Sequence, residues 1–383
     1  MSRNKQLAIV LSVLIYAVVS LTCVLIYQIN EKPSDEPVQQ LPPQHQKISV
    51  TLKAVGDNLI HSPIYESCQT VNGFDFDDVY VHITPHIKEA DIAAINQETI
   101  FVNEAETFFS GYPSFGTPQQ VGESAVRAGF NTITHATNHA YDRGKSAMLH
   151  TMDFWNQHSG VTVLGINKTA EEQQKVQVWE KDGLRIAMLN FTYGLNGGDL
   201  PGDRSYLVNV LDCSDKNAEL LSQAEETADI TVVFMHFGTE YHHTPSAEQK
   251  RDVEFLTVNG ADVIIGTHPH VIQPLTEHTA KNGNKSVVFY SLGNFLSNQS
   301  GTEKILGGMA SVTISKEKGK TLVEHYEMLP TVSHRSHSDG KYSVFMLSDY
   351  TDTLASDNRQ CDLLTVEKLQ NLFDEVMAIE VYN

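Results

Sequence analysis

A regular alternation of short apolar segments with helical segments is the feature that most constrains how this chain can fold. Apolar runs of strand length occur at residues 48–55, 92–95, 131–134, 161–164, 184–191, 230–234, 262–265 and 287–290. Helical patterns lie between most of these runs, and three of them stop at a glycine, Gly129, Gly160 or Gly260, just before a strand. The alternation predicts βαβ units and an α/β fold with helices on both faces of a sheet.

The helix starts and the last part of the chain are also readable. Thr117 and Ser246 are each followed three residues later by Gln, which is the pattern of a capping box at a helix start. Residues 310–315 and 321–329 flank a polar turn and predict a hairpin that closes the sheet. An amphipathic stretch at 363–378 predicts a C-terminal helix.

Length and charge exclude several classes of protein. The chain has 383 residues, with 47 Asp and Glu against 27 Lys and Arg, and its formal net charge is −20. A chain of this length can bury a large core. Because the charge opposes a phosphate backbone, we expect no nucleic-acid partner, and any polyanionic ligand requires a cation to mediate binding.

The N-terminal segment predicts a single membrane span. Residues 7–27 carry no charge and are long enough to cross a bilayer, and Arg3 and Lys5 precede them. The positive-inside rule then predicts a cytoplasmic tail at 1–6 and the rest of the chain outside the cytoplasm. A cleaved signal peptide is the alternative. Residues 28–47 form a proline- and glutamine-rich linker, and an exported domain occupies 48–383, with its core motifs within 50–298.

Polar residues follow almost every predicted strand, where ligands bind in open α/β sheets. The residues in these positions include Asp57, Glu98, Asn138, His139, His236, Glu240, His268 and His270. Carboxylates, an amide and imidazoles form an oxygen and nitrogen ligand set, which favours Mn, Fe or Zn. In an extended segment, His268 and His270 point the same way and reach one centre together. No cysteine pair has zinc-site spacing, and the sequence leaves open a disulfide among Cys68, Cys213 and Cys361.

Taken in order, these strand-end motifs resemble the CapA family of capsule and poly-γ-glutamate synthesis proteins, distant relatives of calcineurin-like metallophosphoesterases. The motifs are Gly56-Asp57, Asn96-x-Glu98, Thr137-Asn138-His139 with Asp142 and Gly144, His236-x-Gly238-x-Glu240, Gly266-x-His268-Pro269-His270-Val271, and Ser291-Leu292-Gly293-Asn294-Phe295. The resemblance implies a four-layer αββα sandwich of two sheets flanked by helices, with one or two divalent metals at the strand ends.

The resemblance also implies a role for each site residue. Asp57 and His270 would bind a first metal, Glu98 would bridge, and Asn138, His236 and His268 would bind a second. His139 would stand beside the metals as an acid or electrostatic stabiliser. The phosphoesterase pattern Asp-x-His departs here to Asp57-Asn58-Leu59, so the first metal lacks one ligand unless His61 or water replaces it.

Two further carboxylates are candidates for supporting or catalytic roles. Asp142 lies three residues after His139 and could orient its ring, or it could cap the helix that starts near Gly144. Glu240 lies four residues after His236 and could orient that ring, act as a general base, or be a solvated loop residue.

Two functional interpretations follow. The first is a membrane-anchored hydrolase of capsule or poly-γ-glutamate biosynthesis or export, which uses metal to cleave a phosphoester or an amide bond. The second is a non-catalytic accessory subunit whose bound cation bridges to an anionic polymer. Both interpretations predict an anionic extracellular polymer or its precursor and the capsule synthesis machinery as partners.

Overall fold

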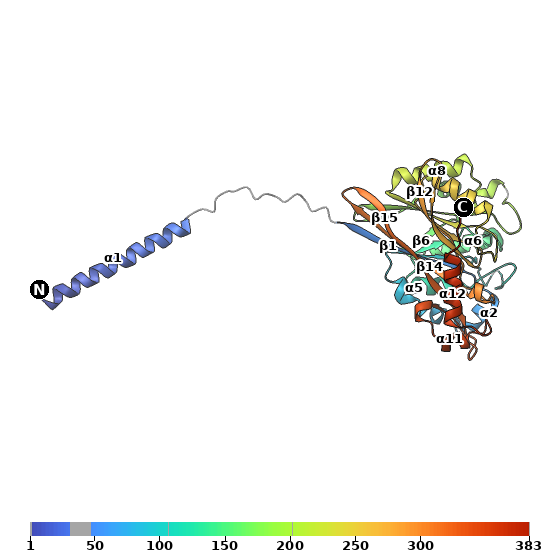
Figure 1. The fold of residues 1–383 in the computed structure, drawn as a ribbon, viewed down its shortest axis with the longest axis horizontal. Coiled ribbons are helices and arrows are strands. Elements are labelled where there is room, and N and C mark those ends of the chain that lie inside the picture. The colour runs from blue at the N-terminus through green and yellow to red at the C-terminus, as the bar shows by residue number, and fades with distance from the viewer. Residues whose placement is uncertain (1, 31–46, 106, 201, 383) are drawn as a thin grey trace. The chain divides into compact units, whose positions relative to one another are not determined.

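The computed structural model describes residues 2–30, 47–105, 107–200 and 202–382, in two compact units, Met1–His45 and Gln46–Asn383 (Figure 1). In the first unit, helix α1 (Arg3–Asn30) contains a stretch long and apolar enough to cross a membrane, a test that a signal sequence also passes. Most of the linker predicted at 28–47 lies outside the described residues.

Two mixed sheets form the body of the second unit. In the first sheet the order is β16-β15-β14-β1-β4-β5-β6, and β13 also pairs with β1. In the second sheet the order is β11-β12-β10-β9-β8-β7, and β2 pairs with β3 separately. The strands of the first sheet are β1 (Ile48–Asn58), β4 (Ile92–Asn96), β5 (Thr132–Thr134), β6 (Thr162–Leu164), β13 (Asn294–Leu296), β14 (Leu306–Glu317), β15 (Lys320–Arg335) and β16 (Tyr342–Met346). Those of the second are β7 (Gln177–Lys181), β8 (Leu184–Thr192), β9 (Ile230–His236), β10 (Val263–Thr267), β11 (Ile272–Thr279) and β12 (Lys285–Leu292), and the separate pair is β2 (Gln69–Thr70) and β3 (Gly73–Phe74).

Each sheet has a parallel centre and antiparallel edges. Strands β1, β4, β5 and β6 are parallel to their neighbours in that row, as are β8, β9, β10 and β12 in the second sheet. Strands β14, β15 and β16 extend the first sheet in antiparallel pairing, and β7 and β11 do so at the two edges of the second. The parallel centres bring several strand carboxyl ends to one edge of each sheet.

The helices connect the strands. They are α2 (Ser62–Ser67), α3 (Asp77–Tyr80), α4 (Thr84–Ile87), α5 (Gln120–Ala128), α6 (Gly144–Trp155), α7 (Ala170–Gln173), α8 (Asp215–Thr227), α9 (Ala247–Val258), α10 (Thr302–Ile305), α11 (Asp352–Asp357) and α12 (Val366–Met377), with 3₁₀ turns η1 (Gly202–Leu207) and η2 (Leu347–Asp349).

Alternate residues of the central strands enter different cores. Leu52 of β1 and Ile186 of β8 belong to one apolar cluster, so the two sheets pack face to face. On the outer face of the first sheet, Ile133 of β5 packs in a cluster with α3, α4, α5 and α6. On the outer face of the second, Val233 of β9 packs in a cluster with α8 and α9. The order helix, sheet, sheet, helix is the four-layer sandwich that the resemblance implies. The strand and helix pattern alone predicted helices on both faces of one sheet, which is wrong because the inner faces of the two sheets pack against each other.

The predicted strands are confirmed to within a few residues, whereas the helix starts are confirmed only in part. The box at Ser246 is present, with its side chain accepting from the Gln249 N–H while Gln249 reaches back to the Ser246 N–H. The box predicted at Thr117 is wrong. The Thr117 backbone instead makes an extended bridge with Phe101, and α5 begins at Gln120. The Thr117 carbonyl oxygen accepts from the Val102 N–H at 3.1 Å, whereas the carbonyl of an N-cap residue accepts the first hydrogen bond of the helix.

Two glycines let the strand ends approach each other. A Cβ on Gly56 would lie 1.9 Å from the Gly293 carbonyl oxygen, and one on Gly266 would lie 2.0 Å from the Tyr290 carbonyl oxygen. Gly56 directly precedes Asp57, whose N–H donates to the same Gly293 oxygen at 2.9 Å. The absent side chain at Gly56 therefore fixes where the Asp57 carboxylate emerges from the sheet.

We predict that Gly56→Ala lowers the free energy of unfolding by about 1–3 kcal/mol, because the methyl group must push two strands apart. Thermal unfolding of the full chain in detergent measures this. Gly194→Ala is the matched control, because nothing lies within 4 Å of a Cβ built there. Equal melting temperatures for the two variants would contradict the close-approach argument.

Candidate metal centre

The carboxyl ends of strands from both sheets bring the predicted site residues together. Asp57 lies at the end of β1, Glu98 follows β4, and Asn138 follows β5 in the first sheet. His236 ends β9 and His268 follows β10 in the second sheet. The cluster therefore forms where the two packed sheets meet at their strand ends.

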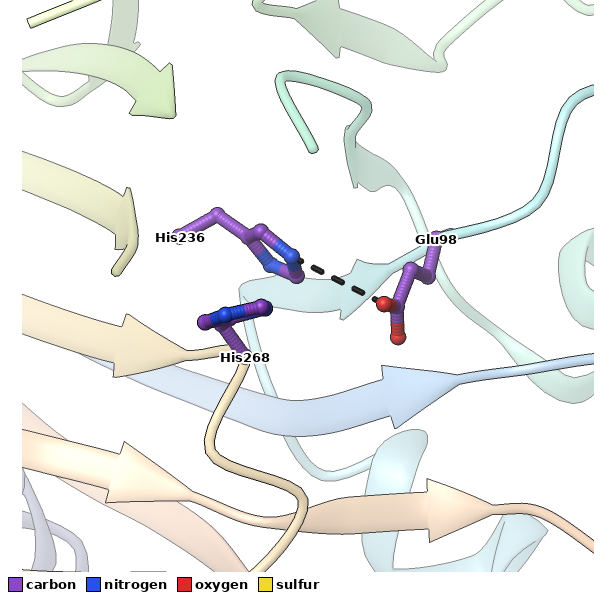
Figure 2. Close-up of side chains that lie close together, drawn as sticks. All are labelled: Glu98, His236 and His268. Carbon is purple, nitrogen blue, oxygen red and sulfur yellow. Dashed lines mark ion pairs between the residues drawn. The ribbon is translucent and has the colours of Figure 1, made fainter. Parts of the chain in front are cut away.

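The side chains form two ligand groups that share one carboxylate. Glu98, His236 and His268 are one group (Figure 2), and Asp57, Glu98 and His270 are the other. In each group, one ligand atom from each residue lies within 4.8 Å of the others, and all of these residues are buried. Glu98 Oε1 is 3.7 Å from His236 Nε2 and 3.9 Å from His270 Nε2. Glu98 is therefore placed between the two groups.

Unpartnered buried atoms test whether a metal fits. Both carboxylate oxygens of Glu98 and Nδ1 of His268 are buried and have no hydrogen-bond partner. A buried polar group without a partner costs free energy, and an ionised carboxylate costs most. A divalent cation would satisfy these atoms, and carboxylate oxygen with imidazole nitrogen is a donor set for such ions. The residues fit one or two divalent metals.

Burial and neighbouring charges set the protonation of the site without metal. Burial and the Asp57 charge raise the pKa of Glu98 well above its usual value. Burial acts to lower the pKa of His270, but the nearby Glu98 and Asp57 carboxylates outweigh it and raise that pKa to about 9. Burial and the neighbouring His270 lower the pKa of His268 to about 3, and burial lowers that of His236 well below its usual value. Glu98, His236 and His268 are therefore uncharged at neutral pH without metal, and a bound cation would favour the ionised form of Glu98.

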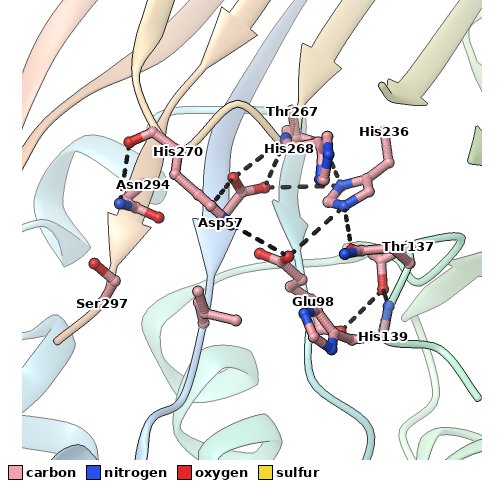
Figure 3. Close-up of polar contacts among 12 residues, drawn as sticks. Asp57, Glu98, Thr137, His139, His236, Thr267, His268, His270, Asn294 and Ser297 are labelled. Atoms are coloured by element: carbon pink, nitrogen blue, oxygen red, sulfur yellow. Dashed lines mark hydrogen bonds and ion pairs between the residues drawn. The ribbon is translucent and has the colours of Figure 1, made fainter. Parts of the chain in front are cut away.

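Amide and hydroxyl groups orient the candidate ligands (Figure 3). Asn96 donates from Nδ2 to Asp57 Oδ1 at 2.8 Å, and His236 Nε2 lies 2.9 Å from Asn138 Oδ1. His236 Nδ1 is 3.0 Å from Thr267 Oγ1. No role for Asn96 or Thr267 was predicted from the sequence. Their positions could have indicated one, because Asn96 lies two residues before Glu98 at the same strand end and Thr267 adjoins His268.

The His-Pro-His segment differs from the sequence expectation in its backbone. His268 has φ 97° and His270 has φ 58°, both left-handed, so the segment is not extended and the expected reason for their convergence was wrong. The rings still reach the site, one in each ligand group, with their centroids 5.9 Å apart. Non-glycine residues at such φ values are strained, and such strain clusters at functional sites.

His139 lies beside the ligand groups and is held from several sides. Its Nδ1 is 2.7 Å from Asp142 Oδ2, and Phe115 donates its N–H to the same oxygen at 2.8 Å. The Phe115 ring meets the imidazole edge to face with the ring centroids 4.7 Å apart, and Asn196 Nδ2 lies 3.2 Å from Nδ1 and 3.4 Å from Nε2 of His139. Asp142 makes no cap contact, because α6 has Arg143 at its N-cap position and no side-chain cap bond. The Asp142 carboxylate therefore orients the imidazole, and Asn196 is a contact that the sequence analysis missed.

Two other residues predicted from the sequence, Glu240 and His61, lie near the cluster without joining either ligand group. The His236 nitrogens contact Thr267 and Asn138 rather than Glu240, so the proposed orienting role for Glu240 has no contact behind it among the described residues. The general-base role of Glu240 stays a prediction. His61 Nδ1 lies 3.0 Å from the Leu59 carbonyl oxygen and is in neither ligand group.

We predict that Glu98→Gln reduces metal content by more than about tenfold, because both groups lose their shared carboxylate while even surrounding-shell changes cost that much. Elemental analysis of the full chain after metal loading and dialysis measures it. The change removes a buried carboxyl group, so the metal-free variant should unfold at an equal or higher temperature. Glu327→Gln, at an exposed carboxylate, is the control. Retained metal in Glu98→Gln would refute the assignment.

Comparisons with known proteins give the family. The family described as "Bacterial capsule synthesis protein PGA_cap" matches residues 51–299, which is more than half of the chain. The chain is 27% identical over 271 residues to the "Capsule biosynthesis protein CapA" of Bacillus anthracis, covering 68% of this chain and 62% of the relative. It is 28% identical over 243 residues to the "PGA biosynthesis protein CapA" of Bacillus subtilis, covering 59% and 58%. The matched regions thus span less than two thirds of either relative.

Solved structures align at lower similarity. The calcineurin-like phosphoesterase YfkN from Bacillus subtilis aligns with a TM-score of 0.46 and 16% identity, over 86% of this chain and 98% of that one. The Haemophilus influenzae NAD nucleotidase NadN aligns with a TM-score of 0.46 and 12% identity, over 86% and 60%. The family match and the two curated relatives agree, and the chain belongs to the CapA family of bacterial capsule synthesis proteins.

Proposed function

We propose that this protein is a membrane-anchored, exported hydrolase of capsule or poly-γ-glutamate biosynthesis that uses divalent metal to cleave a phosphoester or amide bond. The observation that carries the proposal is the Glu98 carboxylate, buried without a partner between two groups of ligand atoms. A merely structural carboxylate would have hydrogen-bond partners at this depth. Groups with strongly shifted pKa values around it also favour a functional site.

The ligand sets divide the proposed work between two positions. Asp57, Glu98 and His270 would hold one cation, and Glu98 with His236 and His268 would hold another, with Asn138 beside His236. When bound there, a divalent metal would supply Lewis-acid polarisation of the bond under attack and a lower pKa for water. Mn, Fe and Zn all suit these donors.

His139 is the residue placed to move a proton. With the Asp142 carboxylate accepting at 2.7 Å, the imidazole carries a proton on Nδ1 and leaves Nε2 free to exchange a second proton. We propose that Nε2 donates a proton to the leaving group.

A second function, that of a cation-bridged accessory subunit, is favoured by one observation. Leu59 stands where the phosphoesterase pattern has a ligating His, and His61 lies outside both ligand groups. A position short of a ligand would leave the metal able to bind polymer carboxylates without efficient catalysis. Turnover measurements separate this role from the hydrolase.

The membrane placement is the third part of the proposal. Helix α1 supplies the apolar segment, and the basic residues Arg3 and Lys5 precede most of it. We propose one span with the tail at 1–6 in the cytoplasm and the folded unit outside. Its partners would be an anionic extracellular polymer or its precursor and the synthesis machinery.

A reporter fused after the C-terminus should be active only in the compartment outside the cytoplasm, because the basic flank holds the N-terminus inside. For the full chain, an alkaline phosphatase fusion should be active and a green fluorescent protein fusion should not fluoresce. In control fusions that lack residues 1–30, the phosphatase should be inactive and the green fluorescent protein should fluoresce. Cytoplasmic reporter activity in the full fusion would overturn the export proposal, and a shortened mature chain would assign α1 as a signal peptide.

His139→Ala should lower turnover by roughly two to four orders of magnitude while metal stays bound, which is the range that general acid catalysis contributes. Hydrolysis of bis(4-nitrophenyl) phosphate and of a γ-linked glutamate oligomer measures turnover, alongside metal analysis. His325→Ala is the control because that ring is exposed on β15. Hydrolysis unchanged in His139→Ala would exclude the proposed acid, and a metal-loaded wild type without turnover would favour the accessory role.

A further inference from the structure

Exposed tyrosines gather around the metal centre. Among residues 47–105, 107–200 and 202–382, the exposed tyrosines are Tyr112, Tyr193, Tyr241 and Tyr382, with exposed fractions of 79%, 45%, 49% and 42%. The Tyr193 ring lies 4.7 Å from the His268 ring, and the Tyr241 ring lies 6.0 Å from the His270 ring. Tyr112 is linked to the site through Phe115. The centroid of the Phe115 ring lies 6.5 Å from that of Tyr112 and 4.7 Å from that of His139. We call Tyr112, Tyr193 and Tyr241 the tyrosine collar.

Three different loops carry the collar, and each is tied to a segment that carries site residues. The Tyr193 N–H donates to the His236 carbonyl oxygen at 2.9 Å, and the Tyr241 N–H donates to the Pro269 carbonyl oxygen at 2.7 Å. The loop of Tyr112 is tied through Ser114, whose hydroxyl donates to the Asp142 carbonyl oxygen at 3.0 Å. These bonds hold the backbone of each loop in place before any ligand arrives, which lowers the entropic cost of binding.

Tyr241 is held in a strained backbone conformation, with φ 64°. A bulky residue at such a φ costs free energy and persists only where its surroundings require it. Burial and the neighbouring Glu240 raise the pKa of its phenol to about 12, so the hydroxyl keeps its proton at neutral pH. Gln299 Nε2 donates to the phenol oxygen at 3.3 Å, and the phenol in turn hydrogen-bonds with the Glu240 carboxylate, so the Tyr241 ring is held from two sides.

A cation adjoins the collar on the His270 side. Lys304 Nζ lies 5.3 Å from the centre of the Tyr241 ring and 3.5 Å from Glu303 Oε1. Asn294 joins the segments of His270 and Lys304, because its Nδ2 donates to the carbonyl oxygens of His270 at 3.1 Å and of Lys304 at 2.9 Å. In a chain of net charge −20, this ammonium and the metal are positive groups to which an anionic chain can bind.

We propose that the tyrosine collar and Lys304 hold an extended, carboxylate-bearing polymer across the metal centre. The inference rests on the proposed function for the polymer and adds the residues that recognise it. The ring faces pack against methylene and amide groups of the chain, the phenols of Tyr112 and Tyr193 donate to its carbonyl or carboxylate oxygens, and Lys304 pairs with a carboxylate. Because the three rings adjoin different residues, an extended chain is long enough to contact all of them, whereas a small ester is not.

The test is the affinity of the full chain, in detergent and loaded with Mn²⁺, for a γ-linked glutamate oligomer by titration calorimetry. Tyr112→Ala, Tyr193→Ala and Tyr241→Ala should each raise Kd by about tenfold, as for a well-placed aromatic contact. Lys304→Gln should raise Kd and reduce its salt dependence, and Lys304→Arg should restore both. Metal content should stay at its wild-type value, which verifies that the metal centre is still folded.

Tyr382→Ala is the control, since its exposure matches that of Tyr193 and its ring packs on His278, away from the collar. An unchanged Kd across the collar variants, or a wild type that does not bind the oligomer, would overturn the inference. Oligomer binding that depends on the collar without any hydrolysis would support the inference while the hydrolase proposal fails. The two proposals are therefore separable by one set of variants.

Discussion

The buried Glu98 carboxylate is the constraint on which the rest of the site depends. It lies where two sheets packed face to face bring their strand ends together, and both oxygens lack a hydrogen-bond partner. Such a group is costly unless a cation compensates it. The surrounding histidines are arranged accordingly: His236 and His268 are kept neutral, as ligands must be, and His270 pairs with Asp57. The chemistry thus follows from where the sandwich places one side chain.

Close backbone approach supports this placement. At Gly56 and Gly266 the neighbouring carbonyl oxygens occupy the space of a side chain, so neighbouring strands meet at their ends. His268 and His270 come shortly after Gly266 and have left-handed φ values, as does Tyr241. A hydrogen bond from the Tyr241 N–H to the Pro269 carbonyl oxygen joins the two loops. Among the described residues, seven non-glycine residues have positive φ, and these three lie at or beside the site. Such conformations cost free energy and persist only where the surrounding structure determines them.

The sequence determined the strands because their signals are local. Each buried strand is a short apolar run bounded by turn residues, and a polar residue at each strand end needs only the parallel-sheet rule to be placed at one edge. The hairpin of β14 and β15 and the helix α12 followed from the same local periodicity. The edge strand β11 gave a weaker signal, because Pro274 interrupts it and its second half is polar. The capping box predicted at Thr117 is absent for a related reason, because the Thr117 backbone forms a β-bridge with Phe101 in another segment.

What the sequence by itself determined is the α/β class, the family and which polar residues converge. The resemblance also implied how these residues divide between two ligand groups. Only the tertiary structure decided that Asp142 orients His139 and does not cap a helix, and that Asn96, Thr267 and Asn196 contact the site residues. It also decided that Tyr193 and Tyr241, from separate loops, lie beside His268 and His270. The physical reason is range: strand and helix patterns repeat within a few residues, whereas hydrogen-bond partners, burial and pKa shifts depend on chains that meet only after folding.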